Sequence, residues 1–530
     1  MKFRKKAIAI ISLALVSAML FTACGSGKTA SSSQGAAGTG TAGKSKDNDM
    51  VIALSESVLS LDPHNLTSTV SISANRAMYE NLLTFDKDMK NIVPQLAKSY
   101  TVSKDGLVYT FTLQTGVKFS DGTDFNAEAV KANIDRCLDE KNNLRSRKYF
   151  AKVKEVKCTD ANTLQITMKE PYSVFINKLT NFGIVSPKAI KDGVKLNTTA
   201  VGTGPFKLKE WDQADHLTVT RNDNYWGTKP GVDSITFKVV PEAGSRIAML
   251  QTGEADMAYP IPPEQIKTID GTKDIKVASV PSNIVYYATL NMSHKPFDNV
   301  KVRQAMNYAI DKDAFVKAVY GGYGDHATSP MASTTQYYSK QEEYAFNIQK
   351  AKELMKEAGY PDGFKTTIWA DNTSDSVKGM QFLNQQLAQI GITAEVVPME
   401  NATLNAKINE AKNAAESKID MWYVSWSPSS GDADGALRSL FYSQNIPPVN
   451  ANTAYYSNPA VDKLLEQGLT ETSPEKLTSL YAEAQKTIWN DAPWLFLGQP
   501  VVQYGVKNYV SNVYMMADGS VGCAQATLAH

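Results

Sequence analysis

A possible phosphate-binding loop is the first chemistry that the sequence suggests. Residues Gly38 to Ser45 read GTGTAGKS and fit the pattern G-x-x-x-x-G-K-[ST] at every position. In that loop, backbone N–H groups and the lysine hold phosphates, provided that a buried strand precedes it and a helix follows. Residues 25–48 contain 18 small residues (Gly, Ser, Ala or Thr) among 24, and no Val, Ile, Leu or aromatic residue. Because such a segment cannot form a buried strand, we interpret it as a flexible tether.

A signal peptide and a lipid-attachment site are predicted ahead of this tether. Four cationic residues between positions 2 and 6 precede an uncharged run of 15 residues, 7–21. That run is shorter than the roughly 20 residues of a membrane-spanning helix, so we predict a secretory signal peptide at residues 1–23. The run Leu20-Phe-Thr-Ala-Cys24 resembles the lipobox of bacterial lipoproteins, which predicts a lipid anchor on Cys24. Residues 24–49 would then tether an extracytoplasmic protein to the cell membrane, at its periplasmic face or at the cell surface.

Size and charge limit the remaining classes of function. The chain has 530 residues, and the 507 that follow residue 23 exceed the usual size of a single hydrophobic core. At least two domains are therefore expected. The net charge of the full chain is +1, which provides no basic field for nucleic acid.

The cysteines and histidines form no recognised metal or catalytic motif. Besides Cys24 the chain has Cys137, Cys158 and Cys523, which leaves either a Cys137–Cys158 disulfide or buried free thiols. The five histidines are far apart, and C-x-x-C, H-E-x-x-H and G-x-S-x-G are absent. A peptidase, the alternative from another class, has no nucleophile–base constellation to support it. We therefore expect no metal, no cofactor and no enzymatic activity.

Hydrophobic periodicity predicts a mixed α/β protein. Strands are expected at Met50–Leu54 and, from alternating apolar and polar residues, at Leu107–Leu113. Asp298 is a candidate N-cap for a helix that should bury Val300 and Met306. Helical spacing and terminal Gly or Pro predict further helices at residues 126–138, 347–359, 459–469 and 474–489. The alternation of strands and helices indicates an α/β class.

Several motifs, in order along the chain, resemble one family. Residues 97–122, AKSYTVSKDGLVYTFTLQTGVKFSDG, resemble the signature of the peptide/nickel-type extracytoplasmic solute-binding proteins of ABC importers, family 5. Matching runs follow at residues 202–206, 222–226, 248–256, 296–310 and 456–462. The resemblance extends over residues 50–515.

The resemblance implies a fold, domain boundaries and partners. It implies a two-lobed, periplasmic-binding-protein type II-like α/β fold with an extra subdomain in lobe I, as in cluster C proteins. Carried over by order, lobe I takes residues 50–285 with the extra subdomain at 91–200, lobe II takes 286–495, and 496–530 return to lobe I. The ligand would be enclosed between the lobes. The implied partners are ABC permease subunits with their ATPase, and we expect a monomeric receptor.

The residues that follow Trp426 help to choose between ligand classes of this family. In dipeptide and oligopeptide binders of this family, an Asp three residues after the tryptophan binds the peptide ammonium, whereas Ser429 stands there in this chain. A neutral hydroxyl cannot replace that charge-assisted bond. The runs 251–262, 426–437, 440–447 and 452–458 are instead similar to the glutathione-binding proteins of this family. The resemblance therefore implies glutathione or a similar small peptide, with di- or oligopeptides and a metal-chelate or haem-type ligand as alternatives.

Glutathione carries two carboxylates, one ammonium and a thiol, which predicts complementary side chains in the cleft. Asp432 and Asp434 are candidates for binding the ammonium, with a purely structural role in a turn as the alternative. Candidates for the carboxylates are Arg145, Arg147 and Arg438. Candidates for the walls and for hydroxyl contacts are Ser68, Thr69, Tyr286, Trp369, Tyr423, Trp426, Ser427 and Ser429.

The tether interpretation predicts the outcome of replacing Lys44. If GTGTAGKS is a solvated linker, Lys44→Ala leaves solute uptake by cells unchanged, because no phosphate contact is lost. A severalfold loss of uptake at equal protein levels would show that the octet has a role of its own.

Overall fold

One long sheet runs through the protein. The computed structural model describes residues 48–529 apart from 271, 273, 429 and 430. Its largest sheet has twelve strands, in the order β16-β15-β17-β13-β18-β11-β1-β10-β9-β8, with β12 and β14 also paired to β18. The strands of this sheet are β1 (Asp49–Leu54), β8 (Phe206–Asp212), β9 (His216–Arg221), β10 (Ser234–Val239), β11 (Met257–Tyr259), β12 (Ile275–Pro281), β13 (Val285–Leu290), β14 (Gly324–His326), β15 (Lys365–Asp371), β16 (Thr393–Met399), β17 (Met421–Trp426) and β18 (Trp494–Lys507).

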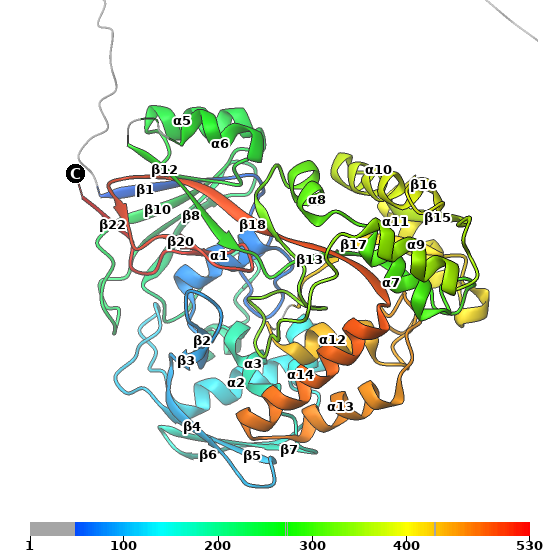
Figure 1. The fold of residues 1–530 in the computed structure, drawn as a ribbon. Helices are drawn as coiled ribbons and strands as arrows, with labels where there is room; N and C mark the ends of the chain where they lie inside the picture. Colours follow the sequence, from blue (N-terminus) through cyan, green and yellow to red (C-terminus); the bar gives the residue numbers. More distant parts are fainter. Residues whose placement is uncertain (1–47, 271, 273, 429–430, 530) are drawn as a thin grey trace, which may run out of the picture. The chain divides into compact units, whose positions relative to one another are not determined.

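The strand β18 joins the two halves of that sheet. Its first residues pair with β13, with Phe496 opposite Tyr287, and its later residues pair with β12, from Val501 opposite Pro281 onward. We call the part that carries β1 and β8–β12 lobe I, and the part that carries β13–β17 lobe II. Because β12 leads into β13 through residues 282–284, two neighbouring extended segments connect the lobes (Figure 1).

Lobe I places three helices against its part of the sheet. These are α1 (Thr69–Met78), α5 (Ala243–Thr252) and α6 (Pro263–Ile269). The chain end after β18 also lies on this lobe, where the Val521 N–H donates to the Ser73 hydroxyl over 2.9 Å. Its short strands form two pairs, β19 (Val510–Ser511) with β22 (Thr527–Leu528) and β20 (Tyr514–Met515) with β21 (Val521–Gly522).

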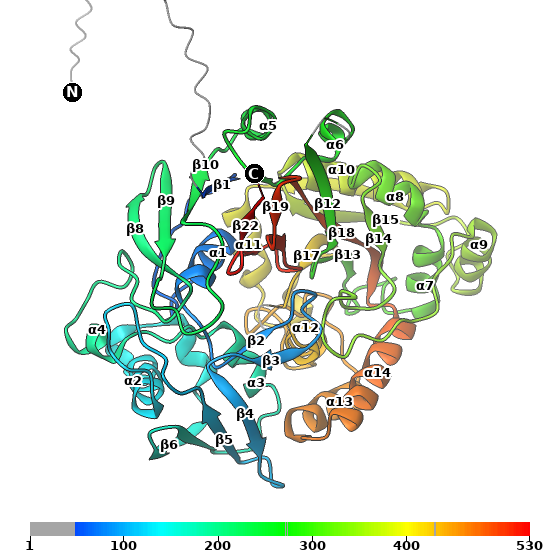
Figure 2. The ribbon, with the colours of Figure 1, turned by 90° about the vertical axis from the view of Figure 1, so that its left-hand side faces the viewer.

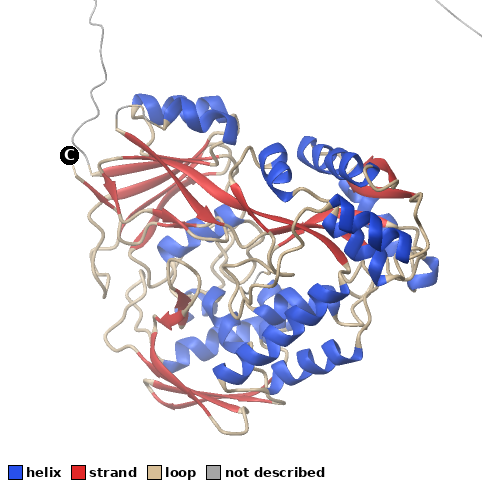
Figure 3. Ribbon diagram, in the orientation of Figure 1, coloured by secondary structure: helices blue, strands red, loops and turns tan. Residues whose placement is uncertain are grey.

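A separate antiparallel sheet lies within the predicted extra subdomain. Its strands follow the order β4-β5-β7-β6, and Figures 2 and 3 show it as a layer apart from the long sheet. The elements in this range are β3 (Ile92–Pro94), β4 (Ala97–Val102), β5 (Val108–Leu113), β6 (Val153–Asp160), β7 (Thr163–Met168), the helices α2 (Ala127–Leu138), α3 (Phe175–Lys178) and α4 (Pro187–Lys191), and the 3-10 turns η1 (Glu140–Asn142), η2 (Arg145–Tyr149) and η3 (Leu179–Asn181). Just before it, β2 (Leu83–Phe85) pairs with β3.

Lobe II is built mostly of helices around β13–β17. Figure 3 shows helices on the outside of these strands. They are α7 (Val300–Tyr308), α8 (Lys312–Val319), α9 (Ile348–Glu357), α10 (Ser374–Ala388), α11 (Asn401–Glu410), α12 (Ala433–Phe441), α13 (Pro459–Thr470) and α14 (Pro474–Asp491), with a 3-10 turn η4 (Ala414–Glu416).

Each of these parts has a hydrophobic core of its own. Met50, Ile52 and Phe237 belong to the core of lobe I, while Phe111 and Phe150 belong to a second core under the four-stranded sheet. Lobe II has two main cores, one around α7 and α10 and one around α12 and α14. Separate cores are what the predicted division into lobes requires, although the predicted boundaries themselves stay a prediction.

Most of the predicted elements are confirmed, and one helix start is corrected. The predicted strands correspond to β1 and β5, and the helices predicted at 126–138, 347–359, 459–469 and 474–489 correspond to α2, α9, α13 and α14. The remaining helix, α7, is capped by Asn299 and not by Asp298, because the Asn299 side chain accepts from the Lys301 N–H. Met306 is buried as predicted, but Val300 is 38% exposed, since it is the first helical residue.

The cysteines are free thiols in the described part of the chain. Cys137 and Cys158 lie on α2 and β6 and are not joined, which decides between the two alternatives left by the sequence. Burial raises the pKa of Cys137 to about 12, so this thiol stays protonated near neutral pH. Among the described residues, no helix is both long and apolar enough to cross a bilayer. The predicted signal peptide, Cys24 and GTGTAGKS lie outside these residues.

Replacing Gly204 by alanine tests how closely the C-terminal end of α1 packs against the backbone at Gly204. A Cβ at Gly204 would lie 2.6 Å from the carbonyl carbon of Met78 and 2.7 Å from the carbonyl oxygen of Ala77, both backbone atoms. We expect Gly204→Ala to lower the free energy of unfolding by about 1–3 kcal/mol in urea titrations. In the control Gly244→Ala, the added Cβ meets only the flexible end of Glu242, 3.1 Å away, so no loss is expected. Equal stability of Gly204→Ala and the wild type would contradict this packing.

Candidate ligand-binding site

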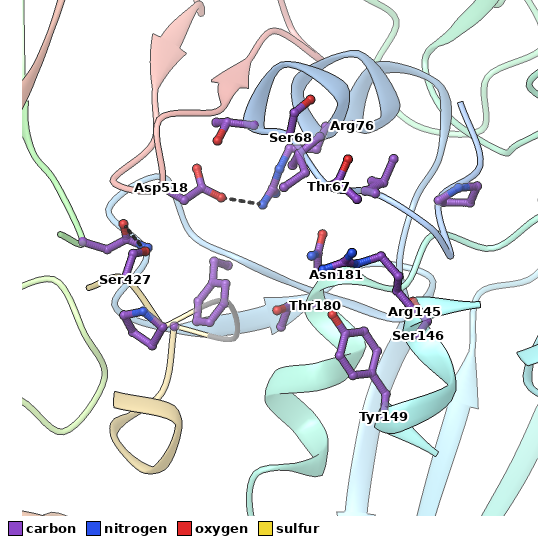
Figure 4. Close-up of a pocket in the computed structure, with 18 of the residues that line it drawn as sticks. Thr67, Ser68, Arg76, Arg145, Ser146, Tyr149, Thr180, Asn181, Ser427 and Asp518 are labelled. Atoms are coloured by element: carbon purple, nitrogen blue, oxygen red, sulfur yellow. Dashed lines mark hydrogen bonds and ion pairs between the residues drawn. The ribbon is translucent and has the colours of Figure 1, made fainter. Parts of the chain in front are cut away.

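A cavity of about 280 Å³ lies where the two lobes and the extra subdomain meet. Figure 4 shows Thr67, Ser68 and Arg76 on one side of it and Arg145, Tyr149 and Asn181 on the other, with Ser427 and Asp518 at one end. The residues that line it are Pro63, His64, Leu66, Thr67, Ser68, Thr69, Ile72, Arg76, Phe85, Met89, Arg145, Ser146, Lys148, Tyr149, Thr180, Asn181, Asn283, Ser427, Pro428, Gly431 and Asp518.

The loop before α1 is held by a buried polar network. The Arg136 guanidinium donates to both carboxylate oxygens of Asp62, over 3.0 and 2.6 Å, and its Nη1 lies 2.6 Å from His64 Nδ1. His64 Nε2 donates to the Gly183 carbonyl oxygen over 3.0 Å, and Nδ1 must accept because the guanidinium beside it can only donate, so the ring is neutral with its proton on Nε2. The His64 carbonyl accepts from the Ser146 N–H over 3.1 Å. This network therefore fixes residues 62–68 against the turn that carries Arg145.

Helix α1 presents one of its faces to the cavity. Ser68 is its N-cap and accepts from the Ser71 N–H over 3.2 Å. Ser68, Ile72 and Arg76 follow at spacings of four, so they lie on the same face of the helix. The positive end of the helix dipole also lies at Ser68 and Thr69, where it favours an anionic group.

The lining carries more positive than negative charge. Arg76, Arg145 and Lys148 contribute cations, and Asp518 is the one carboxylate among the lining residues that the structure describes. Arg76 Nη2 lies 3.5 Å from Asp518 Oδ2. The pKa of Lys148 is lowered by partial burial and by the positive charges of Arg145 and Lys178, so an anionic group beside it would favour its charged form. The lining thus suits a ligand with more carboxylates than ammonium groups.

Asn283 connects this cavity with the segments that join the lobes. Its backbone N–H donates to the Ala517 carbonyl oxygen over 2.9 Å. Its side-chain oxygen accepts from the Ser427 hydroxyl over 2.9 Å. A side chain of lobe II and the C-terminal segment of lobe I are therefore both attached to one residue between β12 and β13.

Four of the residues predicted from the sequence line the cavity together: Ser68, Thr69, Arg145 and Ser427. Ser429 falls outside the described residues. Sequence reasoning missed Arg76, Lys148 and Asp518. The helical spacing from Ser68 could have indicated Arg76, whereas nothing local marks Asp518, which lies 442 residues from Arg76.

The predicted Asp and Arg residues of α12 and η2 are engaged elsewhere. Asp432 is the N-cap of α12, and its Oδ2 lies 3.5 Å from Lys178 Nζ. Asp434 accepts two hydrogen bonds from the Arg438 Nε–H and Nη2–H groups, at 3.0 and 2.7 Å, because the two residues are one helical turn apart. Arg147 pairs with Glu140 on the surface. We therefore leave these four side chains out of the site.

The predicted aromatic walls lie away from this cavity as well. Tyr286 and Tyr423 line a second cavity, of about 840 Å³, and their ring centroids are 5.9 Å apart. Trp369 packs in a small core with Met399 and Leu404. Trp426 packs against the core of lobe II around α12 and α14. The two tyrosines thus line a different cavity, and the two tryptophans pack in the cores of lobe II.

Comparison with known proteins gives matches over most of the chain. Residues 91–448 match the sequence model of the bacterial extracellular solute-binding proteins, family 5. The glutathione-binding protein GsiB of Escherichia coli (strain K12) is 43% identical over 486 residues, which cover 91% of this chain and 94% of GsiB.

Solved structures share the fold. HbpA2 from Haemophilus parasuis superposes with a TM-score of 0.83 at 26% identity, over 91% of this chain and 100% of its own. DppA from Helicobacter pylori, an ABC transporter-associated periplasmic binding protein in complex with the peptide STSA, has a TM-score of 0.70 at 28% identity, over 91% and 98%. Both carry the two-lobed α/β fold that the sequence predicted.

The neutral state of His64 predicts a pH dependence of stability. Burial lowers the pKa of His64 from 6.5 to about 4, although the Asp62 carboxylate acts in the opposite direction. Between these values the unfolded chain binds a proton that the folded chain does not, so stability falls as pH drops from 6.5 to 4. The wild type should therefore lose about 3 kcal/mol more than His64→Gln over this range. Urea titrations at pH 7, 5.5 and 4.5 measure it, and equal losses in both proteins would contradict a neutral His64.

Proposed function

This chain belongs to the bacterial extracellular solute-binding proteins, family 5, and we propose that it captures glutathione or a similar small peptide for an ABC importer. The proteins of this family are transport receptors and not enzymes. The family membership supports an extracytoplasmic location, and a permease with its ATPase as partner. The choice of glutathione goes further and rests on the cavity, with the 43% identity to GsiB as independent support.

The charges that line the cavity are the observation that carries this choice. Glutathione has two carboxylates and one ammonium, and the cavity offers three cations, Arg76, Arg145 and Lys148, and one carboxylate, Asp518. Guanidinium groups bind carboxylates in pairs of parallel hydrogen bonds. A site with this balance favours a peptide with a net negative charge over an ordinary zwitterionic dipeptide.

Arg145 and Lys148 form one end of the proposed site. They belong to the same short turn, η2, and the lowered pKa of Lys148, to which the charge of Arg145 contributes, supports an anion between them. The Ser427 hydroxyl lies across the cavity on lobe II, so a bound peptide would touch both lobes. Such a ligand favours the closed arrangement over the open one and shifts the population of states toward it.

The proposal extends to the parts that position the receptor. Residues 1–23 would be the signal peptide, Cys24 the lipid-modified residue and 24–49 the tether at the membrane surface. The lobe boundaries at residues 285 and 495 fall beside β13 and within β18, the two segments that connect the lobes. Closure would therefore bend the chain near residues 282–284 and 498–501.

Calorimetry with variants of Arg145 tests the proposed function. The wild type should bind glutathione, and Arg145→Gln should bind it about 10- to 100-fold more weakly, because one charge-assisted contact is lost. Arg147→Gln is the matched comparison: it removes the same charge two residues away, from a side chain that pairs with Glu140 outside the cavity, and should change affinity less than threefold.

Two outcomes would overturn the proposal. Binding of unrelated dipeptides without any binding of glutathione would exclude glutathione as the ligand. A larger loss in Arg147→Gln than in Arg145→Gln would mean that the peptide binds outside the 280 Å³ cavity.

A further inference from the structure

Arg76 and Asp518 form a loose ion pair that faces the cavity. Arg76 lies on the cavity face of α1, and Asp518 lies in the turn between β20 and β21. Their side chains are 19% and 20% exposed, and the distance from Nη2 to Oδ2 is 3.5 Å. Figure 4 shows this contact at the edge of the cavity. Charge-assisted hydrogen bonds normally measure about 2.7–2.9 Å, so this pair has not closed into a tight contact.

Neither partner uses all of its hydrogen-bonding groups. Asp518 Oδ1 accepts from the Ser520 N–H over 2.9 Å and from the Ser520 hydroxyl over 2.5 Å, which fixes the carboxylate in place. Its Oδ2 is left with the distant Arg76 alone. Arg76 Nε is buried and has no hydrogen-bond partner among the described residues. A positive and a negative group are therefore held side by side in a fixed arrangement.

We infer that this pair recognises the head of a γ-linked peptide, where one carbon carries both an ammonium and a carboxylate. Asp518 binds the ammonium, and Arg76 binds the carboxylate beside it. The γ-glutamyl end of glutathione has such a head, so the inference rests on the proposed function and adds the orientation of the ligand. The glycine carboxylate at the other end then lies at Arg145 and Lys148.

The same arrangement explains how ordinary peptides would be rejected. An α-linked peptide carries only an ammonium at its first residue, and its carboxylate lies at the far end. Such a peptide would supply an ammonium to Asp518 but no carboxylate to the partly buried Arg76 guanidinium, which costs affinity relative to a γ-linked peptide. Asp434 pairs with Arg438, and Asp432 is the N-cap of α12, is 2% exposed and is not among the residues that line the cavity. Asp518 thus becomes a specificity-determining residue.

Three ligands distinguish the contribution of the α-ammonium from that of the α-carboxylate. They are glutathione, the analogue that lacks the α-amine, and the analogue that lacks the α-carboxylate. Calorimetry of the wild type should show each analogue binding about 10- to 100-fold more weakly than glutathione. Asp518→Asn should lose the preference for the amine and keep the preference for the carboxylate, whereas Arg76→Gln should do the reverse.

The variants have controls for folding and for orientation. An asparagine at 518 keeps an oxygen for the Ser520 N–H, and the melting temperature of each variant checks the fold. Asp192→Asn is the matched control, since it removes an exposed carboxylate that pairs with Lys188 on the surface, and it should keep both preferences. Glutathione amidated at its glycine carboxylate tests the contact of that carboxylate with Arg145. Among the variants, only Arg145→Gln should lose the preference for glutathione over this amide.

The outcomes distinguish this inference from the proposed function. If the wild type binds glutathione but binds the amine-free analogue equally well, the role of Asp518 is wrong and the proposed function stands. The role of Asp518 is equally wrong if Asp518→Asn weakens all three ligands alike. If Arg145→Gln loses the preference for the α-carboxylate, the orientation is reversed. If the wild type does not bind glutathione at all, both the function and this inference fail.

Discussion

The arrangement of the lobes depends on one ribbon of backbone pairing, β12 and β13 against β18. At the point where the ribbon passes between the lobes, the Ser282 hydroxyl donates to the Pro500 carbonyl oxygen over 2.7 Å. Neighbouring residues of an extended chain face opposite sides, so Asn283 lines the smaller cavity while Ser282 and Ile284 line the larger one. A change in the angle between the lobes must be absorbed here. Such a change would therefore move Asn283 and the Ser427 hydroxyl that donates to it.

The second constraint is electrostatic, and it makes the cavity selective. The loop at residues 62–68 is held by a salt bridge and a neutral histidine that are complete without a ligand. The charged side chains that face the cavity lack close partners of opposite charge. Arg76 and Asp518 stay 3.5 Å apart, and Lys148 lies near the positive charges of Arg145 and Lys178. A rigid frame with unsatisfied charges at its inner surface loses little entropy when a complementary peptide binds.

Much of the fold could be predicted from the sequence, but only part of the site. Local signals such as the alternation in β5 and the helical spacing over residues 126–138 were sufficient for individual elements. The pairing of predicted side chains with one another was missed: the spacing of four between Asp434 and Arg438 makes them an ion pair within α12. Asp518 could not be predicted, because only the return of the chain past β18 brings it beside α1. Family resemblance supplied the order of the lobes, which periodicity cannot give.

A crystal structure of the protein with glutathione tests the central claim most directly. We expect the peptide in the 280 Å³ cavity, with its ammonium about 2.7–2.9 Å from Asp518 Oδ2, its α-carboxylate on Arg76 and its glycine carboxylate near Arg145 and Lys148. Glutathione bound in the larger cavity beside Tyr286 and Tyr423 would contradict it. So would an ammonium bound to any group other than Asp518.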